Sequence, residues 1–224
     1  MSTYRERPYR PRRRLKRGYK IAIGVLAVLL VVCIVYMGFL IAQHLRTRNA
    51  PGADVETPDW VNADLLPVNP YSRPGTVLEE VNGIVIHYVG NPNTSAKANR
   101  NFFANLSLTH ETYASSHYIV GLEGEIIQCV PLSEISYCSN DRNRDTIAIE
   151  VCHEDDTGAF SAQTQESVEN LTAWLCVQFG LDSSQVIRHY DVSGKICPKY
   201  YVENEDAWAD LLAGVDARIP TFAQ

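Results

Sequence analysis

The chain has 224 residues, 46% hydrophobic and 21% charged, a globular composition with room for one ordinary domain and additional segments. Residues 1–50 hold eleven Lys and Arg and one acidic residue, for a net charge of +10, whereas residues 51–224 hold nine and 25, for a net charge of −16. The acidic part would repel a polyanion, which argues against nucleic acid as a partner.

The N-terminal region predicts a single transmembrane helix. Residues 21–42 are apolar and uncharged, and a helix of that length, at about 1.5 Å per residue, spans roughly 33 Å, enough to cross a bilayer core. Nine Lys and Arg lie within residues 1–20, whereas only Arg46 and Arg48 follow the run closely. The positive-inside rule keeps the basic tail, residues 1–20, in the cytoplasm and places the rest of the chain outside.

A cleaved signal peptide is the alternative for the same segment. Its apolar region is normally about 7–15 residues long and is followed by a cleavage site of the small-x-small type. The run at 21–42 is longer, and Leu40-Ile41-Ala42 matches such a site poorly. The sequence therefore favours an uncleaved anchor, which makes the chain a single-pass protein of the cell membrane with an extracytoplasmic domain.

Residues 43–60 predict a linker, because they are polar and contain Pro51, Gly52 and Pro58. From residue 61 to residue 224 the chain reads as one globular domain. Runs of β-branched residues predict strands at 81–89, 117–122, 125–130 and 146–152, with a short strand or loop at 186–190. Apolar periodicity and end signals predict helices at 94–106 with Thr94 or Ser95 as N-cap, at 161–179 ending at Gly180, and at 204–217. We therefore expect an α/β domain of three layers, with a central mixed β-sheet flanked by helices.

Three residues suggest a metal site: His87 near the end of the first predicted strand, and His189 and Cys197, which are eight residues apart. Two imidazoles and a thiolate suit zinc, and three protein ligands leave the fourth position of a catalytic site for water. The spacing alone is weak evidence, because a histidine at a strand end is more often a hydrogen-bonded structural residue.

The cysteines outside the predicted membrane helix, which holds Cys33, are odd in number: Cys129, Cys138, Cys152, Cys176 and Cys197. Disulfides are the usual fate of cysteines outside the cell, so one is left over. A metal thiolate at Cys197 would account for it, and a simple free thiol is the alternative. The pairs Cys129 with Cys138 and Cys152 with Cys176 are conceivable, but four cysteines allow three pairings and the sequence does not choose among them.

Four segments, in order along residues 68–212, resemble the type 2 N-acetylmuramoyl-L-alanine amidases, a family that includes phage lysozyme amidases and peptidoglycan recognition proteins. They are GIVIHYVGNPNTSA, SSHYIVGLEGEIIQCVPLSEISY, TIAIEV and RHYDVSGKICP. Residue by residue, the resemblance implies zinc ligands at His87, His189 and Cys197, with Glu150 and Lys195 as catalytic residues. The family's usual Asp-Pro-Gly ending is Cys-Pro-Lys here, which leaves the conformation of that loop open.

The activity implied by the resemblance is hydrolysis of the amide bond between N-acetylmuramic acid and L-alanine in peptidoglycan. Zinc would polarise the carbonyl and activate water, Glu150 would transfer protons, and Lys195 would stabilise the oxyanion. From the residues alone, Glu150 shares a strand face with Ala148 and Cys152 and should be half-buried. Without the resemblance, Lys195 would be a solvated loop residue.

Other candidate residues are weaker. His117 is expected to pack and hydrogen-bond in the hairpin rather than act in catalysis, and Asp191 to order its own loop rather than bind metal. Tyr88 and Tyr118 could line the substrate groove, but tyrosines beside apolar strands are more often part of the core.

Two other functions stay open. A peptidoglycan-binding module without catalysis would typically lack the third zinc ligand. A cysteine hydrolase that pairs Cys197 with His189 would need no zinc and would resist a chelator. The expected partners are peptidoglycan and, through the N-terminal helix, the membrane.

Overall fold

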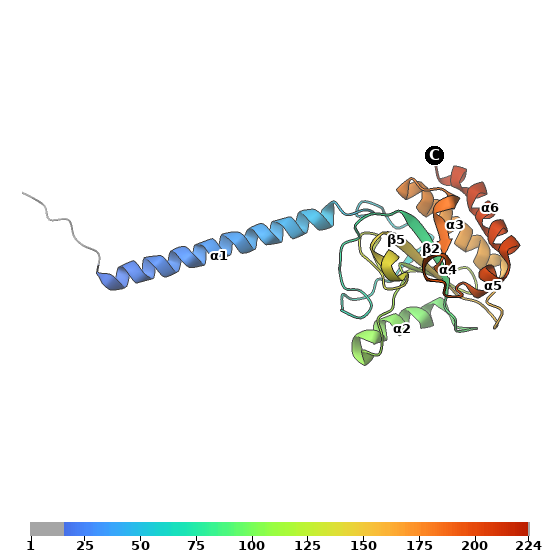
Figure 1. The fold of residues 1–224 in the computed structure, drawn as a ribbon, viewed down its shortest axis with the longest axis horizontal. Coiled ribbons are helices and arrows are strands. Elements are labelled where there is room, and N and C mark those ends of the chain that lie inside the picture. The colour runs from blue at the N-terminus through green and yellow to red at the C-terminus, as the bar shows by residue number, and fades with distance from the viewer. Residues whose placement is uncertain (1–15, 224) are drawn as a thin grey trace, which may run out of the picture. The chain divides into compact units, whose positions relative to one another are not determined.

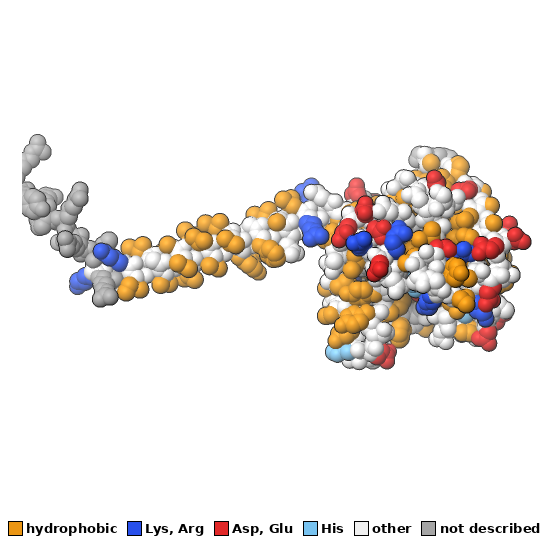
Figure 2. All heavy atoms as spheres, viewed as in Figure 1, with side chains coloured by type: hydrophobic (Ala, Val, Ile, Leu, Met, Phe, Trp, Pro, Cys, Tyr) orange, Lys and Arg blue, Asp and Glu red, His pale blue; other side chains and the backbone are white. Residues whose placement is uncertain are grey.

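The computed structural model describes residues 16–223, so the tail expected at residues 1–20 lies mostly outside the described residues. The chain divides into two compact units, one up to Leu45 and one from Arg46 onward. The first contains most of helix α1 (Arg17–Arg48), which continues beyond its predicted end at residue 42. The most apolar window of this helix has a mean hydropathy of 3.0 and is fully exposed, and Figure 2 shows hydrophobic side chains along its length. By length and composition it is able to cross a membrane, a property that N-terminal signal sequences share.

The segment expected to be a linker, residues 43–60, is helical up to Arg48, and from Arg46 onward it belongs to the second unit. Ala50 is buried, and Val55 packs against the cluster of buried apolar side chains that includes Ile86 and Ile149, which we call the main core. Gly52 has a φ of +72°, and a Cβ at this position would lie 2.7 Å from the Cβ of Leu132. Only glycine fits there, so this stretch belongs to the fold of the domain.

The second unit is built on a six-stranded mixed sheet in the order β1-β4-β3-β5-β2-β6. Figure 1 shows two of its central strands, β5 and β2, side by side. The strands are β1 (Asn62–Ala63), β2 (Gly83–Tyr88), β3 (Tyr118–Val120), β4 (Ile126–Gln128), β5 (Thr146–Val151) and β6 (Val186–Arg188). β3 and β4 form an antiparallel hairpin, and the other four strand pairs are parallel. The predicted strands are confirmed, whereas the two-residue β1 is too short to produce a periodicity.

Helices cover both faces of this sheet and confirm the predicted α/β class. They are α2 (Ala96–Thr109), α3 (Ala162–Phe179), α4 (His189–Ser193), α5 (Lys199–Glu203) and α6 (Glu205–Phe222), with 3₁₀ turns η1 (Asn140–Arg144) and η2 (Ser183–Gln185). α3 and α6 bury one face together with Ile86 and Ile149, and α2 buries the other with Ile119 and Ile127. The predicted N-cap and C-terminal stop are confirmed, because Ser95 Oγ accepts from the Ala98 amide and Gly180 has a φ of +65°. The first and last predicted helices of the domain end later than expected, at Thr109 and Phe222.

All six cysteines are free, so neither conceivable disulfide is formed. Cys152 lies in the cluster beneath α2, whereas Cys176 lies on α3, so the sheet separates the two sulfurs. Cys129 belongs to the same cluster as Cys152, but Cys138 instead hydrogen-bonds to Glu150.

His117 is a buried structural histidine, as the sequence predicts. Its Nδ1 accepts a hydrogen bond from the Ala148 amide at 3.0 Å, so the ring proton resides on Nε2, which donates to the Glu134 carbonyl at 2.9 Å. Burial lowers the pKa of this imidazole to about 4. A second proton would remove the acceptor that Ala148 uses, so the fold requires neutral His117.

We expect His117 to make the stability of the protein depend on pH between 6.5 and 4. Within this window the unfolded chain takes up a proton that the folded chain excludes, so the free energy of unfolding falls as the pH is lowered, by about 3 kcal/mol at pH 4. His117→Gln should be less stable at pH 7.5 but should show a flatter slope below pH 6.5. Urea unfolding of the full-length protein in detergent measures both slopes, and equal slopes for the two proteins would contradict this assignment.

Candidate metal centre

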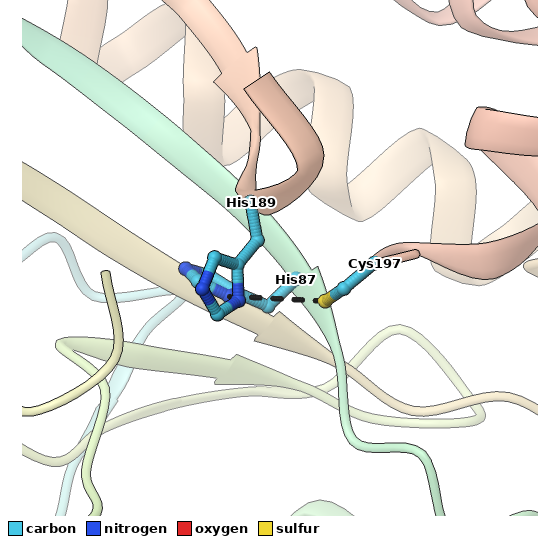
Figure 3. A group of neighbouring side chains, drawn as sticks. All are labelled: His87, His189 and Cys197. Atoms are coloured by element: carbon cyan, nitrogen blue, oxygen red, sulfur yellow. Dashed lines mark hydrogen bonds between the residues drawn. The ribbon is translucent and has the colours of Figure 1, made fainter. Parts of the chain in front are cut away.

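Three side chains converge where β2 and β6 end (Figure 3). His87 is the second-last residue of β2, His189 follows β6 as the first residue of α4, and Cys197 lies in the loop between α4 and α5. β2 and β6 are parallel neighbours, so their carboxyl ends meet at one edge of the sheet. All three residues are buried, and their donor atoms lie within 4.8 Å of one another.

The loop that follows β6 is folded so that Cys197 returns to His189. The Tyr190 amide donates to the Cys197 carbonyl at 3.0 Å, which closes the loop. Arg188 holds its base through paired contacts with the Asp191 carboxylate and a 2.9 Å hydrogen bond to the Tyr201 carbonyl. Asp191 therefore orders its own loop, as expected, and is not part of the group His87, His189 and Cys197, which we call the donor group.

The spacing of the donor atoms suits a tetrahedral cation. The Nδ1 atoms of His87 and His189 lie 3.1 Å apart, and the Cys197 sulfur lies 3.9 Å from His87 Nδ1. Tetrahedral zinc with ordinary bond lengths would separate the two nitrogens by about 3.3 Å and a nitrogen from the sulfur by about 3.6 Å. These two separations are within a few tenths of an ångström of that arrangement, and the three residues form a possible metal site.

The outer nitrogen of each histidine is held by a neighbouring oxygen. His87 Nε2 lies 3.1 Å from Ser139 Oγ, and His189 Nε2 lies 2.6 Å from Asn140 Oδ1. Metal-binding histidines usually have such a partner on the second nitrogen, which fixes the ring orientation. With both outer nitrogens engaged, the two Nδ1 atoms are left to face the centre. The sequence gives no motif for Ser139 or Asn140, and neither residue was predicted.

Burial holds all three donor groups in their uncharged forms. It lowers the pKa of His87 and of His189, an effect strengthened by the Lys195 charge, and it raises the pKa of the Cys197 thiol to about 12. The Tyr88 amide opposes the last shift, because its hydrogen bond to Cys197 favours the thiolate. A divalent cation would select the two neutral imidazoles as they are and would displace the thiol proton.

Glu150 lies beside this group, because its position on β5 pairs with His87 on β2. Its Oε1 accepts a hydrogen bond from the Cys138 thiol at 3.4 Å, while its buried Oε2 has no partner among the described residues. Burial raises the pKa of this carboxyl to about 7. A carboxyl that titrates near neutrality and has one uncommitted oxygen is suited to accept and return a proton. Glu150 and Cys138 also form a second donor group that shares only His87 with the first.

A cleft of about 560 Å³ opens over these residues. Four of the predicted site residues line it: His87, Glu150, His189 and the exposed Lys195. Cys197 is buried and does not line the cleft. The remaining wall includes Cys138, which the sequence offered only as a disulfide candidate, and residues that the sequence did not single out, among them Tyr113, Tyr137 and Asn140. Tyr88 and Tyr118 do not line the cleft and belong to the core instead. Tyr118 is fully buried, and Tyr88 packs against the main core.

Comparison with known proteins gives matches over most of the second unit. A family model described as N-acetylmuramoyl-L-alanine amidase matches residues 78–200. The N-acetylmuramoyl-L-alanine amidases BlyA of Bacillus subtilis (strain 168) and CwlL of Bacillus licheniformis are 35% and 34% identical to the chain, and each match covers 69% of this chain and 46% of the relative. The chain thus spans about half the length of these curated relatives. The solved catalytic domain of XlyA matches with a TM-score of 0.59 and 27% identity, over 69% of this chain and 98% of that domain.

We expect the full-length protein, purified in detergent, to bind one zinc ion per chain through the group His87, His189 and Cys197. Cys197→Ser should lower the zinc affinity on the order of a hundredfold or more, since the loss of a ligand should exceed the roughly 10–100-fold cost of losing a group that only orients a ligand through a hydrogen bond. Metal analysis after dialysis against zinc buffers measures this effect. Cys138→Ser is the matched control, because it alters the other thiol beside His87 and should keep the metal. If Cys138→Ser loses the zinc and Cys197→Ser keeps it, the metal site is the second donor group of His87, Cys138 and Glu150.

Proposed function

The chain belongs to the N-acetylmuramoyl-L-alanine amidase family, as its sequence predicts, and on that basis we propose that it hydrolyses the amide bond between N-acetylmuramic acid and L-alanine in peptidoglycan. We propose further that a zinc ion held by His87, His189 and Cys197 is its cofactor. The observation that carries the proposal is the meeting of this donor group with Glu150 and Lys195 at one cleft.

The donor group provides the proposed cofactor site with two fixed imidazoles and one thiol, which would lose its proton to a bound cation. A zinc ion bound there supplies Lewis-acid activation of the scissile carbonyl and of water. An amide nitrogen leaves poorly unless it is protonated. Glu150 answers this need, because its free Oε2 can accept the proton of the attacking water and pass it to the departing nitrogen.

Lys195 has a different part in the proposed reaction. Its charge already acts on Glu150 and on His87, where it favours the carboxylate and disfavours the imidazolium. The side chain is exposed in the cleft and can approach a substrate oxygen. A positive donor at a developing oxyanion typically lowers a barrier by about 2.7–4 kcal/mol.

Two alternatives fit the site less well. A peptidoglycan-binding module would have no use for a carboxyl whose pKa is raised to about 7 next to a complete donor group. A cysteine hydrolase needs an accessible thiolate, whereas the Cys197 thiol is 2% exposed and burial raises its pKa to about 12.

We also propose that α1 is an uncleaved membrane anchor that places the domain on the outer side of the cell membrane. The length, hydropathy and full exposure of α1 support this, together with the basic residues that precede it in the sequence. An enzyme tethered in this way would act on the wall of its own cell.

The full-length protein in detergent should release peptides with a free N-terminal L-alanine from purified peptidoglycan. A strong chelator should stop the release, and added zinc should restore it, because the donor group would be empty without the ion. Mass spectrometry of the products identifies the bond that is cut. Activity that survives complete removal of metal would refute the zinc-dependent reaction.

Glu150→Gln in the same assay separates proton transfer from binding. The amide keeps the shape but cannot take a proton, so kcat should fall about 100-fold or more while zinc content and peptidoglycan binding persist. Glu123→Gln, in an exposed turn outside the cleft, is the control and should be as active as the wild type. Unchanged turnover in Glu150→Gln would remove this residue from the proposed reaction.

The anchor has its own test. Cells that express the chain with a C-terminal tag should retain a full-length product in the membrane fraction after an alkaline wash, and protease added outside should remove the tag. A tagged product in the medium that lacks residues 1–42 would show instead that the apolar helix is a cleaved signal sequence.

A further inference from the structure

One wall of the cleft is aromatic, and the proposed reaction does not use it. It is formed by Tyr113, Ala114 and Tyr137. Tyr113 is 61% exposed, unlike the buried tyrosines of the core. Figure 2 shows exposed hydrophobic side chains on this part of the domain, beside the C-terminal end of α2.

Tyr113 is supported from behind by a stack of rings. Its ring lies 5.2 Å from that of Tyr71 at an angle of 24°, and Tyr71 lies 4.2 Å from His110 at an angle of 10°. The ring of Tyr137 meets Tyr113 edge-on, at 5.7 Å and 84°. We call these four residues the aromatic stack. Such pairs stabilise one another beyond their buried area, so the stack holds Tyr113 in a fixed orientation.

The backbone fixes the same loops. The Ala114 amide donates to the Tyr71 carbonyl at 3.1 Å, and the Ser115 amide donates to the Tyr137 carbonyl at 3.1 Å. The Tyr137 amide in turn donates to Ser115 Oγ at 3.0 Å. An exposed ring that is held in this way loses little conformational freedom when a ligand covers it, which favours a binding role over a mobile surface residue.

The strand order gives the cleft a direction. The sheet runs β3-β5-β2-β6, and the aromatic stack joins the chain that leads into β3. Glu150 on β5 and His87 on β2 come next, followed by His189 and Lys195 after β6. The cleft therefore has an aromatic end and a cationic end, with Glu150 and His87 between them. Lys195 is the one Lys or Arg among the residues that line it.

The proposed substrate has the same asymmetry about its scissile bond. On one side lies the glycan, whose neutral sugar rings present C–H faces that suit the negative face of an aromatic ring. On the other side lies the stem peptide, whose free carboxylates are attracted over a longer range by the positive charge of Lys195, while its N-terminal nitrogen is part of the scissile bond. We propose that the aromatic stack is a subsite for a sugar ring of the glycan strand, with Tyr113 as its platform, so that the peptide extends towards Lys195. This orientation rests on the proposed function.

A binding measurement without catalysis tests the subsite. The probe is a tetramer of β-1,4-linked N-acetylglucosamine, which has sugar rings but no peptide and no scissile bond. The full-length protein should bind it, Tyr113→Phe should bind it equally well, and Tyr113→Ala should lose about two- to tenfold in affinity, as expected for one aromatic contact. Phe102→Ala, which removes an exposed aromatic on α2 outside the cleft, is the control and should bind like the wild type. Thermal melting checks that each variant is folded.

Kinetics then test the orientation with two series of substrates, one lengthened in glycan and one lengthened in peptide. In Tyr113→Ala the improvement in KM gained from a longer glycan should shrink two- to tenfold, while the improvement gained from a longer peptide is retained. If the peptide series changes instead, the stack holds the peptide and the proposal is wrong. A wild type that hydrolyses peptidoglycan but does not bind the tetramer also overturns it. Tetramer binding through Tyr113 without any hydrolysis would refute the proposed function and leave the sugar subsite standing.

Discussion

The parallel pairing of β2 with its two neighbours is the constraint on which the site depends. His87 stands opposite Glu150 across the β2–β5 pair, and Ile86 stands opposite Arg188 across the β2–β6 pair, which puts His189 at the next position. Because each pair is fixed by the backbone, three side chains of the candidate site are aligned before any side-chain contact is made. A slip of one residue in either pair would turn the side chains to the opposite face of the sheet and dismantle the group.

Burial then determines the protonation state of the side chains in the candidate site. A low-dielectric setting favours the uncharged form of every member, so the imidazoles are free bases, the Cys197 sulfur carries its proton, and the pKa of Glu150 rises to about 7. For the imidazoles this is already the form that binds a cation. For the cysteine it means that metal binding and loss of a proton are one event, so metal affinity should increase with pH.

The sequence predicts the parts of this arrangement that have a local signal. Strands rich in β-branched residues, helix ends at Ser95 and Gly180, and the family segments around His87, Glu150 and His189 are all readable from short windows, and the structure has them in place. The sequence does not predict that residues 50–60 pack into the domain, because that packing depends on contacts between distant residues, such as Gly52 with Leu132. The number of cysteines suggests disulfides, but a count does not show which face of the sheet each cysteine occupies, and the structure has none of these bonds. The aromatic stack joins residues 71, 110, 113 and 137, which no window contains.

One short segment without any motif, residues 138–140, contacts side chains of the candidate site on β5, on β2 and at the start of α4. Cys138 contacts Glu150 from β5, Ser139 contacts His87 from β2, and Asn140 contacts His189 after β6. The segment is itself fixed by Asn143, whose Oδ1 accepts from the amides of residues 138 and 139. Three consecutive residues thus orient three side chains that come from different strands and helices. A shift of the backbone at residues 138–140 would therefore disturb all three side chains together. The geometry of the site is therefore set twice, by strand pairing from below and by this segment from outside, and only the first of these leaves a recognisable pattern in the sequence.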